Sequence, residues 1–149
     1  MTLFTRRTML MAGAGSAALA VLPTGLLAQE EEVDGAAIAE EMIAEFTGGA
    51  EVSDGDGVQL TAPEIAENGN TVPISVNAPG ASAVLLLAMG NPVPGVARFN
   101  FGELAGSQSA STRIRLAETQ DVVAIAQLAD GGFVRTTANI KVTIGGCGG

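Results

Sequence analysis

The chain has 149 residues, a formal net charge of −9, one cysteine and no histidine. Its length suits a single domain, and a chain this acidic would repel the phosphates of nucleic acids. One cysteine cannot form a disulfide within the chain, and without histidine it cannot complete the usual zinc site of sulfur and nitrogen ligands. The composition therefore argues against a nucleic-acid-binding protein, a disulfide-rich scaffold and a zinc protein.

The amino-terminal segment, residues 1–28, has the pattern of a twin-arginine export signal. Arg6 and Arg7 precede an apolar, small-residue stretch over residues 11–22, which is shorter than the roughly 20 residues of a membrane span. A membrane-anchoring or amphipathic helix is the alternative interpretation. We expect export to the periplasm, cleavage after Ala28 and no membrane attachment of the mature chain. Cleavage would remove two arginines and no acidic residue, so the mature chain would be more acidic still.

A helical pattern follows the acidic start of the mature chain. Asp34 stands at an N-cap position, and Gly48 and Gly49 mark the carboxyl end. Between them, apolar side chains recur at helical spacing: Ile38, Met42, Ile43 and Phe46. This spacing predicts one helix, over residues 36–46, that packs on the rest of the domain.

From Val58 onward the pattern changes to short strands separated by turn residues, which is typical of a β-sandwich or barrel. The continuous apolar run at 83–89 predicts a strand that is buried on both faces. Pro73 predicts an edge strand or a bulge, and Arg113 and Arg115 are expected on a solvated or partner-facing side. The expected strands cover residues 71–78, 83–89, 96–101, 109–116, 122–129 and 134–144.

The last of these strands alternates most strictly, and Lys141 would enter the core if its register slipped by one residue. Its apolar face is expected to consist of Val134, Ala138, Ile140, Val142 and Ile144. The strand therefore predicts a rigid anchor that stops at Ile144, with a glycine-rich arm beginning at the next residue.

The arm itself reads Gly145, Gly146, Cys147, Gly148 and Gly149. Glycine has no Cβ and accepts φ angles of either sign, so the four glycines predict a flexible arm with an exposed thiol. A free cysteine has a pKa near about 8.5 and is mostly protonated at neutral pH. The chain supplies no histidine to activate the thiol, and Lys141 and Arg135 are better explained as solubilising residues of the strand. We therefore expect no catalysis by this chain alone.

Residues 54–57, Asp-Gly-Asp-Gly, are read as a turn, because they lack the remaining ligand positions of a calcium loop. No metal and no cofactor is expected from the sequence. On the residues alone, two functions remain open for Cys147. One is a sulfur carrier, and the other is an exported immunoglobulin-like structural module whose terminal cysteine forms an interchain disulfide. A thiol peroxidase or disulfide enzyme is disfavoured, since no resolving cysteine is present.

The chain resembles the SoxY family, the sulfur carriers of bacterial thiosulfate oxidation. The resemblance lies in the export signal, the helix at 36–46, the segment Glu67-Asn68-Gly69-Asn70-Thr71-Val72-Pro73 and the terminal GGCGG. It implies a mainly β fold, an immunoglobulin-like β-sandwich over residues 29–144 with one amino-terminal helix, and a carrier arm at 145–149. It also implies covalent attachment of sulfur to Cys147.

The same resemblance implies partners and a reaction order. SoxZ would form a heterodimer with the chain. SoxAX, a haem cytochrome, would join thiosulfate to Cys147, SoxB would release sulfate by hydrolysis, and SoxCD would oxidise the remaining sulfur. These three contacts would be transient, because the same arm must enter each active site in turn.

Overall fold

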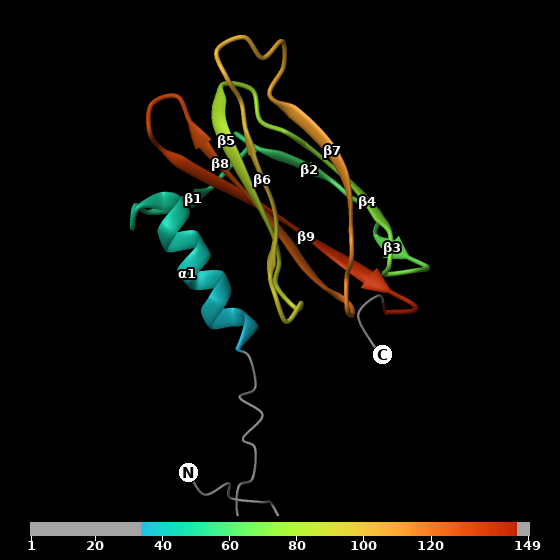
Figure 1. Cartoon of the computed structure of the whole chain (residues 1–149). Helices are drawn as coiled ribbons and strands as arrows, with labels where there is room; N and C mark the ends of the chain where they lie inside the picture. The colour runs from blue at the N-terminus through green and yellow to red at the C-terminus, as the bar shows by residue number, and fades with distance from the viewer. Residues whose placement is uncertain (1–33, 146–149) are drawn as a thin grey trace, which may run out of the picture. The chain divides into compact units, whose positions relative to one another are not determined.

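The computed structural model of the chain describes residues 34–145. In this part the chain forms one helix and nine strands, arranged as two β-sheets with the helix on the outer face of one of them (Figure 1). This architecture confirms the predicted mainly β class and the immunoglobulin-like sandwich with one amino-terminal helix. The elements are α1 (Gly35–Thr47), β1 (Val52–Asp54), β2 (Gln59–Thr61), β3 (Ile65–Ala66), β4 (Val72–Asn77), β5 (Ala81–Ala88), β6 (Gly95–Asn100), β7 (Ser109–Ile114), β8 (Gln120–Leu128) and β9 (Phe133–Val142).

Both ends of α1 are capped as the sequence predicted. The Asp34 carboxylate accepts hydrogen bonds from the backbone N–H groups of Ala36 and Ala37, at 3.0 and 3.3 Å. Gly48 ends the helix in the left-handed conformation, with φ at 64°. The helix therefore extends one residue beyond the predicted range at each end.

The larger sheet has the strand order β1-β9-β8-β5-β6, and β3 pairs with β9 outside this path. Both β1 and β3 run parallel to β9: β1 lies beside the beginning of β9, at Phe133–Arg135, and β3 lies beside its end, at Lys141–Val142. The smaller sheet is antiparallel, in the order β2-β4-β7. The last strand of the fold is thus paired near both of its ends.

Strand β5 contributes to two apolar clusters, one on each face. Val84 and Leu86 belong to the core between the sheets. Leu85 and Leu87 pack on the opposite face with Phe46 of α1. The prediction that 83–89 forms a strand buried on both faces is confirmed, and α1 is the element that covers the second face (Figure 1).

The structure corrects two expectations about strand positions. Strand β4 lies between β2 and β7, so the prediction of an edge strand at Pro73 is wrong. Proline is tolerated there because β2 pairs only with Ser75–Asn77, which leaves Pro73 beyond the end of β2. Ile144 is 65% exposed, because β9 ends at Val142 and the core does not reach it.

Candidate functional site

The predicted sulfur-bearing residue, Cys147, lies outside the described residues together with Gly146, Gly148 and Gly149. The structure describes Ile144 and Gly145, which we call the arm root. The arm root lies at the same end of the sandwich as β3 and the carboxyl end of β7 (Figure 1). The geometry of the site therefore begins with how this root is held.

Backbone hydrogen bonds hold the end of β9 and the two residues that follow it. The N–H of Lys141 donates to the Glu64 carbonyl at 2.9 Å, and the N–H of Thr143 donates to the Ala66 carbonyl at 3.0 Å. The carbonyl of Ile144 then accepts from the N–H of Gly69 at 2.7 Å. The backbone is thus bonded as far as Ile144.

The turn at 67–70, part of the segment that carried the resemblance, connects the arm root to the opposite sheet. Its Gly69 donates to Ile144 and accepts, through its carbonyl, from the N–H of Leu116 at 2.8 Å. The side chain of Asn68 accepts from the N–H of Asn70 at 2.9 Å, which closes the turn. One turn therefore joins the ends of β9 and β7.

Gly145 lies directly against the carbonyl oxygen of Ala117. A Cβ on residue 145 would collide with this oxygen, so the observed backbone path requires glycine there. The sequence predicted that Gly145 supplies flexibility, and that role stays a prediction. The contact with Ala117 is a second reason for glycine that the sequence did not reveal.

A polar network holds the loop at 115–119, which carries Ala117. The side chain of Asn91 donates to the Arg115 carbonyl at 2.8 Å and accepts from the N–H of Ala117 at 2.9 Å. Gln120, which is only 6% exposed, donates to the Asn91 side chain at 2.9 Å and to the Glu118 carbonyl at 3.2 Å. It also accepts from the N–H of Gly90 at 2.8 Å. No role in the site was assigned to Asn91 or Gln120 in the sequence analysis.

The basic side chains that the sequence singled out are exposed, as expected. Arg113, Arg115 and Lys141 all lie at the surface. Arg135 forms an exposed ion pair with Asp54, with 2.8 Å between Nε and Oδ1. This hydrogen bond and the positive charge of Arg135 hold the pKa of Asp54 below its usual value. The pair lies at the beginning of β9, away from the arm root.

Residues 54–57, which the sequence analysis read as a turn and not as a calcium loop, begin with the last residue of β1 and continue as a bend and turn. Among residues 34–145, no group of three or more histidine, cysteine or acidic side chains could hold a metal ion. In the same range, no helix is long and apolar enough to cross a membrane.

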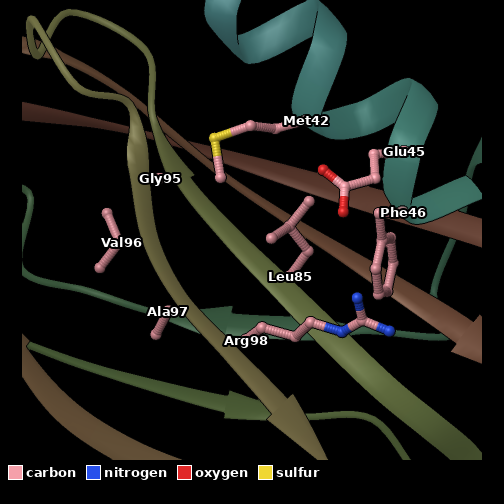
Figure 2. Close-up of a pocket in the computed structure, with 8 residues that line it drawn as sticks. All are labelled: Met42, Glu45, Phe46, Leu85, Gly95, Val96, Ala97 and Arg98. Carbon is pink, nitrogen blue, oxygen red and sulfur yellow. The ribbon is translucent and has the colours of Figure 1, made fainter.

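A pocket of about 310 Å³ lies between α1 and β6, as Figure 2 shows. Met42 and Phe46 line it from the helix, and Leu85 lines it from β5. The Arg98 guanidinium lies 5.0 Å from the centre of the Phe46 ring. A Cβ on Gly95 would meet the Met42 sulfur at 2.9 Å, so glycine lets the helix approach the strand. The pocket therefore lies where α1 packs on the sheet, and it is separate from the arm root.

The comparisons with known proteins agree with this architecture. The family described as sulfur oxidation protein SoxY matches residues 43–147. The sulfur carrier protein SoxY from Chlorobium limicola f thiosulfatophilum is similar in structure, with a TM-score of 0.64 and 33% identity over 73% of this chain and 99% of that chain. No match was found among the curated proteins.

A superoxide reductase (neelaredoxin) from Ignicoccus hospitalis is also similar in fold, with a TM-score of 0.52. Its identity is 17%, over 58% of this chain and 80% of that chain, so this likeness concerns the fold alone. The family match, by contrast, extends from α1 through the terminal cysteine. The chain therefore belongs to the SoxY family.

Proposed function

We propose that the chain is a periplasmic sulfur carrier that holds thiosulfate-derived sulfur on Cys147 and presents it to the enzymes of thiosulfate oxidation. The observation that carries the proposal is the hydrogen-bonded backbone that precedes the cysteine in the sequence. The backbone is hydrogen-bonded as far as Ile144, and the cysteine follows three residues later between two pairs of glycines. A fixed base next to an unshielded thiol suits delivery of a bound group into the cleft of another protein.

The proposed cycle begins with an oxidation. The Cys147 thiol and thiosulfate form a new S–S bond, and one proton and two electrons leave, with the electrons passing to the haem cytochrome SoxAX. Water then attacks the terminal sulfonate sulfur in SoxB, which releases sulfate and a proton and leaves a persulfide on Cys147. SoxCD would oxidise the remaining sulfane sulfur. In each step the carrier supplies the attachment atom.

The sequence near Cys147 supplies no group that would activate the thiol, which suits a carrier whose thiol should react only in its partners' active sites. A thiol needs a base or a positive neighbour to become a strong nucleophile at neutral pH. The sequence has no histidine, and glycine flanks Cys147 on both sides. Activation is therefore assigned to the partner enzymes, so that the thiol reacts only when it has entered one of their sites. In this proposal the chain is a carrier subunit and performs no catalysis alone.

The partners and the location follow from family membership and from the amino-terminal pattern. SoxZ is the proposed partner in a heterodimer, and the contacts with SoxAX, SoxB and SoxCD are transient. Export by the twin-arginine pathway, with cleavage after Ala28, would bring the protein to the periplasm without a membrane anchor. In this proposal the chain itself binds neither nucleic acid nor a cofactor.

The proposal is tested by intact-mass analysis of the protein isolated from cells grown on thiosulfate. We expect added masses of thiosulfate or sulfur that localise to Cys147, disappear on reduction and are absent in Cys147→Ser. A homogeneous unmodified mass would overturn the proposal. A stable disulfide between two unmodified chains would instead support the alternative, an exported structural module joined through Cys147.

A further inference from the structure

We propose that Asn91 and Gln120 are positioning residues of the carrier arm. They fix the loop at 115–119, and the Ala117 carbonyl in that loop fixes where Gly145 leaves the sandwich. The proposal rests on the proposed function, because it concerns how the arm is presented to partner enzymes.

The first step is how Asn91 holds the loop. Its amide group donates to the Arg115 carbonyl and accepts from the Ala117 N–H, so that it spans Leu116 with one bond on each side. Leu116 itself is fully buried, and its N–H donates to Gly69. Three hydrogen bonds and one buried side chain thus fix three consecutive residues of the loop.

The second step is how the Ala117 carbonyl is oriented. Asn91 holds the N–H of Ala117, and Gln120 donates to the carbonyl of Glu118, the next residue. The peptide group between Ala117 and Glu118 is therefore bracketed by two side-chain contacts. Gln120 is buried, and its amide also bonds to Gly90 and Asn91, so it has little freedom to follow a moving loop.

The third step is the contact with the arm. The oriented carbonyl of Ala117 occupies the space where a side chain on residue 145 would stand. Ile144, the preceding residue, is bonded to Gly69, which is bonded in turn to Leu116 of the same loop. The arm root is thus connected to the loop in two ways. Ile144 is bonded to it through Gly69, and Gly145 lies against the Ala117 carbonyl.

The functional consequence concerns entropy. Every residue that is mobile in the free carrier must be ordered when the arm enters an active site, and ordering one residue changes the docking equilibrium by a factor of roughly 5 to 30. A root fixed at Gly145 removes this cost for one residue at each visit, so in this proposal Gly145 does not share the flexibility that the sequence predicted for it. The fixed root also places the start of the arm at one point on the sandwich, which is the same for every partner.

The test uses Asn91→Ala and the more conservative Asn91→Asp, which keeps the acceptor for Ala117 and loses the donor to Arg115. We expect the backbone order parameter of Gly145, from ¹⁵N relaxation, to be about 0.85 in the wild type and below about 0.6 in Asn91→Ala. Asn91→Asp should lie between these values. The KM of a partner enzyme for the loaded carrier should rise roughly 5- to 30-fold in Asn91→Ala, with kcat unchanged.

Phe133→Leu is the matched control, because Phe133 lies in the cluster beneath α1, at the opposite end of β9. It should lower the melting temperature and leave both the order parameter of Gly145 and the KM unchanged. The proposal is overturned if Gly145 is already mobile in the wild type, if Asn91→Ala leaves its order parameter unchanged, or if the KM does not rise. If Asn91→Ala does not fold, Asn91→Asp and Gly145→Ala give the same readouts.

Failure of the carrier function would look different. In that case the wild-type protein would carry no sulfur adduct, whatever the order parameter of Gly145 is. A fixed arm root without adducts would refute the sulfur chemistry and leave the positioning of the arm intact, whereas adducts on a chain with a mobile root would refute only the positioning.

Discussion

Replacement of Phe46 by alanine should remove a large part of the stability that α1 contributes. The ring is 7% exposed and makes an edge-to-face contact with Phe133, with 5.7 Å between centroids and 71° between planes. Truncation of a buried phenylalanine to alanine costs about 3–5 kcal/mol, against a total of about 5–15 kcal/mol for a typical domain. Phe46→Ala should therefore lower the free energy of unfolding by about 3–5 kcal/mol.

Phe46→Leu separates the aromatic contacts from simple burial. Leucine keeps much of the apolar area but loses the edge contact with Phe133, worth about 0.5–1.5 kcal/mol, and the exposed Arg98 cation above the ring, worth about 0.5–1 kcal/mol. We expect a total loss of about 1–2.5 kcal/mol for this variant. A double-mutant cycle with Phe133→Leu should give a coupling of about 0.5–1.5 kcal/mol.

Urea unfolding followed by far-UV circular dichroism is the appropriate assay, because the chain has no tryptophan or tyrosine to report by fluorescence. The reasoning is refuted if Phe46→Ala costs less than about 1 kcal/mol, since α1 would then not depend on this ring for docking. It is also refuted if the leucine variant is as unstable as the alanine variant.

Three further outcomes are expected. Gly95→Ala should destabilise the protein by about 1–3 kcal/mol in thermal melts through overlap with Met42, and its cost should be smaller in a Met42→Ala background, whereas an equal cost in both backgrounds would contradict the overlap. Because the pKa of Asp54 is lowered in the folded state, its ion pair makes a small contribution to stability above the usual pKa of 3.8, and this contribution is lost as the pH falls through the lowered value. Arg135→Gln should move the pKa of Asp54, measured by NMR titration, back up toward 3.8. An unchanged pKa would exclude the ion pair in solution. Cys147→Ser should melt and co-purify with the partner as the wild type does, and a loss of partner binding would make the cysteine structural.

Elements with a strong local period could be predicted from the sequence. Strand β9 and helix α1 each carry their own pattern, and the apolar run of β5 showed that something must cover its second face. Strands β1 and β3 were not predicted, because three and two residues are too short to show alternation. They are strands only through their pairing with β9, which depends on residues far away in the chain.

In the candidate site, too, some residues could be predicted from the sequence and others could not. Cys147 stands out because composition alone marks it as the single thiol of the chain, set among glycines. Asn91 and Gln120 carry no such mark, because their partners in the arm-root network lie mostly 24 to 30 positions away in sequence. Gly145 was recognised as a glycine of the arm, but its contact with Ala117 could be seen only once the two segments were placed together.

The pairing around β9 also bears on how two such molecules can associate. One side of β9 is taken by β8, and on the other side β1 and β3 occupy its two ends, so that among the described residues only 136–140 lack a neighbouring strand there. Exposed strand edges are templates for aggregation, and short, interrupted edges suppress it. Pairing of a second molecule along this side of β9 is therefore confined to these five residues, which is a much shorter edge than the ten-residue strand would otherwise offer.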